Sequence, residues 1–335
     1  MKNFIKKHKI ISGILIYLIV VVLALFVVSH AVYHRSFVAT VIELYMVIID
    51  REKIYSEGPD FDANLELRAV ENLKPYLKPD SVKMDIPYYD TYEHGMQVYH
   101  FNEEVLTDTM IIYYPGGGFV NDPLKYHWKI INKLSQETNC PVLMPVYPKV
   151  PNFTCEESYE IVMKFYLDVV KNENIKKVIF IGDSSGGGMS LVMAQLLRDN
   201  YPDVLQPEEL ILLSPWIDLS SDNEEIEVVD PDDPMLDSYG LIELGNRWAG
   251  NLDVHDPLVS PIYGSFDNIG HITMFASTRD ILCPDAVRFS EMLTEQEIDH
   301  IFVCEEGLNH PYVLFPIPEA KEARAVMVDA ILGNY

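Results

Sequence analysis

The chain has 335 residues, of which 48% are hydrophobic, and its formal net charge is -26. This length allows one large α/β domain or two smaller ones. Beyond residue 35 the chain carries 20 basic against 51 acidic residues, and a body this acidic is repelled by phosphate backbones and anionic lipid surfaces, which excludes nucleic acid as an expected partner.

The N-terminus has the pattern of a membrane segment. Residues 1–9 form a basic flank with four lysines, and residues 10–28 contain no charge, which is long enough to span a bilayer. We therefore predict a transmembrane signal-anchor at 10–28, with a cytoplasmic N-terminus and an extracytoplasmic body. A secretory signal cleaved near Ala31 is the alternative, and a buried core helix is the least favoured one.

A helical lead-in is expected at 29–80. Residues 37–50 are apolar with Glu43 as the only internal charge, which predicts an amphipathic helix that lies on the membrane or over the active site. A second helix is expected at 64–76. We interpret this region as part of a cap that precedes the catalytic domain.

From residue 81 to 335 the pattern changes to alternating strands and helices. We expect strands at 82–89, 96–101, 109–114, 141–147, 178–181, 209–213, 272–276 and 300–303, and helices at 125–134, 155–170, 189–199, 285–295 and 319–332. The alternation predicts an α/β fold, with a mostly parallel eight-stranded sheet, helices on both faces, and sites at the C-terminal ends of strands. Residues 216–265 interrupt the alternation, with a short helix at 239–248, and are a candidate cap insertion.

The strand at 178–181 is followed by the run Gly182-Asp183-Ser184-Ser185-Gly186-Gly187-Gly188. Strand, sharp turn and helix around Gly-x-Ser-x-Gly are typical of a nucleophile elbow, in which Ser184 would be the nucleophile. Glycines two residues before and after the serine would remove the bulk that the turn cannot hold. A glycine-rich turn without chemistry is the alternative.

A second glycine motif, Pro115-Gly116-Gly117-Gly118, follows the strand at 109–114. Consecutive glycines leave backbone amides uncovered, which is what an oxyanion in acyl transfer requires. A phosphate-binding loop or a flexible loop is the alternative, but the Gly-Lys-Ser pattern of a phosphate loop is missing here.

Together the two motifs resemble the hormone-sensitive-lipase-like branch of the α/β-hydrolase superfamily, which pairs a His-Gly-Gly-Gly loop with a Gly-Asp-Ser-Ala-Gly-Gly elbow. The resemblance extends from about residue 80 to the C-terminus and includes segments similar to those after the family's sixth strand. These are Ser214-Pro215-Trp216-Ile217-Asp218-Leu219, Asp233-Pro234-Met235-Leu236 and Asp256-Pro257-Leu258-Val259-Ser260-Pro261.

The resemblance implies a catalytic triad. Ser184 matches the nucleophile, Asp280 matches the acid after the seventh strand and His310 matches the base after the eighth. The chain order Ser, Asp, His is that of the superfamily. Glu305 and Glu306 are less favoured substitutes for the acid.

It also implies an oxyanion hole made by the amides of Gly117, Gly118 and Ser185. Pro115 stands where the family usually has histidine, and its fixed φ would hold the loop instead. Ser185 replaces the usual alanine and is a weaker rival nucleophile. We expect support or exposure, without a part in the reaction, for Asp183, Asp218, Asp256, His94, His127, His255, His271 and His300.

The cysteines predict no zinc site, because Cys140, Cys155, Cys283 and Cys304 lack close paired spacing. They are too few for a disulfide scaffold. Cys283 and Cys304 come near the ends of neighbouring strands, so a bridge between them is an alternative to four separate thiols.

The sequence thus predicts a membrane-tethered serine hydrolase, a carboxylesterase that cleaves small-molecule esters with short acyl groups, acetyl included, through an acyl-enzyme and without metal or cofactor. An amidase or peptidase with the same triad is one alternative, and a catalytically silent scaffold or adhesion module is another. The sequence does not predict the oligomeric state.

Overall fold

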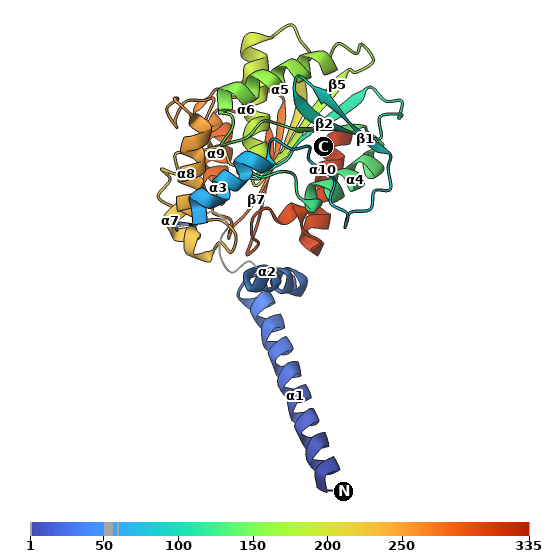
Figure 1. Ribbon diagram of the computed structural model, residues 1–335, viewed down its shortest axis with the longest axis vertical. Helices are drawn as coiled ribbons and strands as arrows, with labels where there is room; N and C mark the ends of the chain where they lie inside the picture. Colours follow the sequence, from blue (N-terminus) through green and yellow to red (C-terminus); the bar gives the residue numbers. More distant parts are fainter. Residues whose placement is uncertain (1, 50–55, 59, 335) are drawn as a thin grey trace.

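The computed structural model describes residues 2–49, 56–58 and 60–334, and side chains are described from Ile11 onward. Its centre is an eight-stranded sheet in the order β1-β2-β4-β3-β5-β6-β7-β8 (Figure 1). The strands are β1 Tyr88–Glu93, β2 Met96–Phe101, β3 Thr109–Tyr114, β4 Val142–Val146, β5 Lys177–Asp183, β6 Pro207–Leu213, β7 His271–Ser277 and β8 His300–Glu305. The pairs β1–β2 and β2–β4 are antiparallel, and the other neighbours are parallel. The predicted mostly parallel sheet is confirmed.

Helices cover both faces of this sheet. The buried residues of α4 and α10 belong to one hydrophobic core, and those of α5, α6 and α9 belong to the other. The helices of the body are α4 Lys125–Thr138, α5 Cys155–Val169, α6 Ser185–Asn200, α9 Cys283–Glu295 and α10 Pro318–Leu332. Because the central strands are buried on both sides, they are continuous apolar runs, as in other parallel sheets.

Two predicted elements are misplaced. The strand expected at 82–89 is β1, six residues further on at Tyr88–Glu93, because Val82 and Ile86 enter the core from irregular chain and do not pair with a neighbouring strand. The helix expected at 64–76 is α3, Asp60–Glu71. Pro75 lies inside the expected range, and proline cannot continue a helix.

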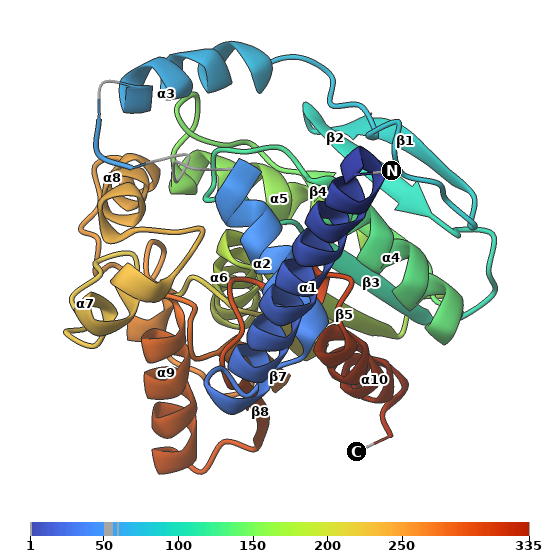
Figure 2. The ribbon, with the colours of Figure 1, turned by 90° about the horizontal axis from the view of Figure 1, so that it is seen from below.

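The N-terminal helix α1, Lys2–Ala31, projects away from the body (Figure 1). Among the described residues one helical stretch, Ile11–Ala31, is long and apolar enough to cross a membrane by length and composition, and of its side chains only Ser29 is buried in the protein. Helix α2, Phe37–Ile49, runs across the top of α1 and separates it from the sheet, as the view from below also shows (Figure 2).

The segment after β6 is mostly irregular. It contains the short α7, Ile226–Val229, and the longer α8, Ser238–Ala249. Helix α8 packs against α3, where the rings of Phe61 and Tyr239 meet edge to face at 5.5 Å between centroids. The two segments predicted to form the cap are therefore in contact.

Candidate active site

Ser184 sits in the tight turn between β5 and α6. Its backbone has φ 52° and ψ -126°, a conformation that a residue with a side chain rarely adopts. A Cβ on Gly182 would be 2.1 Å from the Gly186 carbonyl oxygen, and a Cβ on Gly186 would be 2.0 Å from the Tyr114 carbonyl oxygen. The turn therefore closes only with glycine at both positions.

Asp280 and His310 meet at the ends of β7 and β8. The distance from His310 Nδ1 to Asp280 Oδ2 is 2.9 Å, and both side chains are buried. Burial opposes a charge on the His310 ring, but the charge and hydrogen bond of Asp280 outweigh it and raise the pKa of His310. The charges of Asp233 and of Asp183, at the end of β5, act on the pKa of His310 in the same direction.

The two glutamates considered as substitute acids have other surroundings. Glu306 lies 3.9 Å from the ring of His34, with about two thirds of its side chain exposed. Glu305 ends β8, where it is in register with Ser277. The His310 nitrogen that a catalytic acid would orient, Nδ1, is hydrogen-bonded to Asp280 and to neither glutamate.

Sequence reasoning missed a second carboxylate beside Asp280. Asp233 is buried and accepts hydrogen bonds from the amides of Met235, Leu236 and Ile281. Burial and the charge of Asp280 raise the pKa of Asp233 to about 6. The only signal in the sequence was the Asp-Pro-Met-Leu run, which points to the family and to no particular contact.

The glycine loop after β3 lies close to the elbow in space. Gly117 has φ 138° and Gly118 has φ 63°, and within the described residues neither amide donates a hydrogen bond to the protein. The amide of Ser185 opens α6, where the first N–H groups of a helix have no intrahelical acceptor. The three amides predicted for the oxyanion hole thus belong to two neighbouring, sharply turned segments.

The loop is held without the usual histidine. The Tyr147 hydroxyl donates to the Pro115 carbonyl at 2.6 Å, and the Gly116 amide donates to Asp183 Oδ1 at 3.1 Å. The Phe119 amide donates to Ser185 Oγ at 3.2 Å. Ser185 is fully buried and its hydroxyl accepts this hydrogen bond from the loop. Its side chain is therefore better placed to support the loop than to attack a substrate.

Asp183 connects the elbow to two other elements. Its carboxylate accepts from the Tyr113 hydroxyl at 2.8 Å and lies 3.1 Å from His127 Nε2. The other His127 nitrogen, Nδ1, accepts the Leu124 amide at 2.8 Å, which leaves Nε2 as the nitrogen that donates to Asp183. Burial raises the pKa of Asp183, but the charge of His127 and the hydrogen bonds of His127, Tyr113 and Gly116 outweigh it and hold the pKa below its ordinary value.

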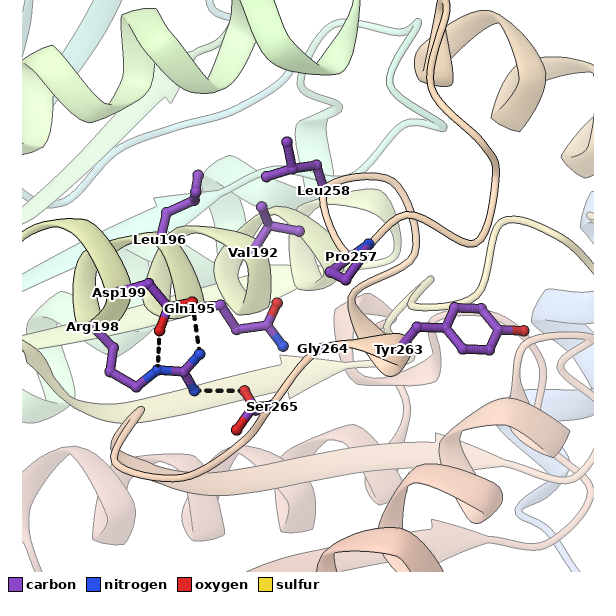
Figure 3. A pocket seen from close by; sticks show the side chains of 10 residues that line it. All are labelled: Val192, Gln195, Leu196, Arg198, Asp199, Pro257, Leu258, Tyr263, Gly264 and Ser265. Carbon is purple, nitrogen blue, oxygen red and sulfur yellow. Dashed lines mark hydrogen bonds and ion pairs between the residues drawn. The ribbon is translucent and has the colours of Figure 1, made fainter.

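The described surface has a pocket of about 410 Å³ between α6 and residues 257–265 (Figure 3). Arg198 at its edge is bound by Asp199 and by the Ser265 carbonyl. None of the predicted catalytic or oxyanion residues lines it. We therefore treat it as separate from the candidate active site.

Comparisons with known proteins agree with the fold described above. Residues 111–314 match the profile of a family described as alpha/beta hydrolase fold. A triacylglycerol lipase of Mycobacterium tuberculosis is 27% identical over 227 residues, which are 68% of this chain and 47% of the lipase, so this chain matches about half of that relative's length.

Two solved structures are similar over most of the body. An esterase candidate from Staphylococcus aureus superimposes with a TM-score of 0.80 at 26% identity, covering 85% of this chain and 98% of the other. An esterase from the bacterial hormone-sensitive lipase family has a TM-score of 0.74 at 20% identity, covering 86% of this chain and 96% of the other.

Proposed function

This chain belongs to the alpha/beta hydrolase family, and on that basis we propose that it is a carboxylic ester hydrolase with Ser184, His310 and Asp280 as its catalytic triad. The observation that carries the proposal is the buried Asp280–His310 pair at the same sheet edge as the strained turn of Ser184. The names of its relatives, a lipase and esterases, support the ester class.

The reaction would proceed through an acyl-enzyme. His310 takes the proton of the Ser184 hydroxyl as the oxygen attacks the ester carbonyl, and Asp280 stabilises the imidazolium that forms. The amides of Gly117, Gly118 and Ser185 receive the oxyanion. His310 then protonates the leaving alcohol, and a water activated by the same histidine releases the acid.

The acyl group would be short. Phe119 follows the oxyanion glycines and stacks on Trp248 with ring centroids 4.0 Å apart, and Trp216 lies 5.8 Å from Phe119 on another side. All three rings are buried, and the Trp216 amide donates to the Ser184 carbonyl at 2.9 Å. Bulky rings on segments that adjoin the elbow would limit the room for a long chain, which supports acetyl or similar acyl groups.

The body would be tethered by residues 10–28. The length and apolar character of Ile11–Ala31, and the exposure of its hydrophobic side chains, support a membrane span. The lysines of residues 1–9 support a cytoplasmic N-terminus with the body on the other side.

A panel of p-nitrophenyl esters from acetyl to dodecanoyl tests the proposal. We expect hydrolysis that declines as the acyl chain lengthens, is abolished in Ser184→Ala and survives in Ser185→Ala. Activity of the Ser184→Ala variant at the native level would refute the assignment of the nucleophile. Preference for an amide or peptide substrate would instead support the amidase alternative.

A further inference from the structure

The segment between α1 and α2 is bound to the loop that carries His310. The Arg35 guanidinium donates to the Gly307 carbonyl at 2.7 Å, three residues before His310. A Cβ on Gly307 would be 1.8 Å from the Tyr33 carbonyl oxygen, and Gly307 has φ 73°, so only glycine fits there. On its inner side α2 also joins the hydrophobic core, through Ala39.

The single acidic residue of α2 faces this contact. Glu43 accepts hydrogen bonds from Arg35 and from Arg279, the residue before Asp280, and both oxygens receive the Arg279 guanidinium at 2.8 and 2.6 Å. The ring of Tyr33 lies 4.6 Å from the guanidinium carbons of both arginines. Burial raises the pKa of Glu43, but the two arginines outweigh it and keep Glu43 ionised. The helix is thereby fixed to both loops of the candidate catalytic pair.

The outer face of α2 is apolar apart from the hydroxyl of Tyr45. Among residues 37–48, where side chains are described, the exposed residues are Val38, Val41, Leu44, Tyr45, Val47 and Ile48. No charged side chain of this stretch lies on that face. A contiguous apolar surface of this kind marks an interaction site. Helix α2 lies at the end of α1 that meets the body (Figures 1 and 2), and the exposed side chains of Ile11–Ala31 are largely apolar as well.

We propose that α2 is an interfacial helix whose outer face lies in the surface of a bilayer of zwitterionic lipid, with the loops of Asp280 and His310 directly behind it. The occupant is a bilayer because α2 lies at the body end of the membrane span, on which proposal this inference rests. The acidic body disfavours anionic lipid. The substrate would then be a short-acyl ester of an amphiphilic, membrane-resident alcohol, with its ester bond at headgroup level.

Fluorescence quenching tests the position of the helix. The three tryptophans, Trp128, Trp216 and Trp248, are buried, so Tyr45→Trp adds emission from the outer face of α2. With full-length protein in brominated phosphatidylcholine vesicles we expect the added emission to be quenched. The emission added by Leu332→Trp, at the far end of α10, should be unchanged. Equal behaviour of the two variants would overturn the proposal.

Hydrolysis in the same vesicles, made without bromine, tests the substrate class. The variant Leu44→Gln/Ile48→Gln should lose most hydrolysis of embedded hexadecyl acetate and keep that of soluble p-nitrophenyl acetate. The control Leu106→Gln/Leu332→Gln, with exposed leucines away from α2, should keep both. If the α2 variant and the native protein hydrolyse both esters at equal rates, this inference alone is overturned. It is also overturned if the native protein hydrolyses the soluble ester but not the embedded one. Failure of native protein on the soluble ester would overturn the proposed function instead.

Discussion

The hydrogen bonds of Asp183 predict a large effect for the isosteric change Asp183→Asn. An asparagine can keep its oxygen toward Tyr113 and Gly116, but its amide group then faces the Nε2–H of His127 across about the 3.1 Å that separates the native pair. The His127 Nε2–H and the asparagine N–H that faces it are then two buried donors without an acceptor, at about 1–3 kcal/mol each. Removal of a buried charge offsets part of this cost, so we expect a net loss of about 2–4 kcal/mol.

Thermal unfolding followed by circular dichroism measures this loss. We expect the melting temperature of Asp183→Asn to fall by roughly 3–6 °C, and that of Glu160→Gln, a change in an exposed ion pair on α5, to stay at the native value. In the background of His127→Phe the cost of Asp183→Asn should be smaller, because the facing donor is gone. A native melting curve for Asp183→Asn, or equal costs in both backgrounds, would refute the reasoning.

Three further predictions concern the site and its supports. Asp280→Asn should lower the rate of p-nitrophenyl acetate hydrolysis by about 10⁴-fold. It should also move the acid limb of the pH–rate profile to lower pH, because His310 is a base only while neutral and loss of the carboxylate lowers its raised pKa. An acid limb at the native pH would contradict this. Gly186→Ala should lower the free energy of unfolding in denaturant by about 3 kcal/mol, because the added Cβ meets the Tyr114 carbonyl. The control Gly58→Ala, in open space, should leave it unchanged. Equal denaturation midpoints for the two variants would count against the tight turn. The free thiols of Cys283 and Cys304 lie 3.6 Å apart, so diamide should join them in a disulfide and remove two of the four titratable thiols of the native protein. Cys304→Ser should form no intramolecular disulfide. Retention of all four thiols in the native protein would count against the pairing.

Local signals in the sequence were sufficient for the sheet and for the position of the elbow. The strands β2 and β3 begin and end where the apolar runs do, and the run at 178–181 becomes β5 with one residue added at its N-terminal end and two at its C-terminal end. Glycine spacing around Ser184 specified a turn that only glycine can close, and the structure has that turn. These features depend on neighbours in the chain, which a sequence displays directly.

Contacts between distant segments could not be predicted in this way. The bond between His127 and Asp183 spans 56 residues, and that between Glu43 and Arg279 spans 236, so no periodicity or spacing connects either pair. His127 was expected to be structural or exposed, and the structure places it, buried, beneath the elbow. The apolar pattern of 37–50 predicted an amphipathic helix, but whether it faced a membrane or the active site depended on those same distant partners.

The account's central claim is that Ser184 is a nucleophile activated by His310 and Asp280. Full-length protein treated with a fluorophosphonate probe, digested and examined by mass spectrometry tests it most directly. The account predicts one adduct, on the peptide that contains Ser184 and at that residue, which is lost in His310→Ala. An intact protein that remains unlabelled, or an adduct at Ser185 or any other serine, would contradict it.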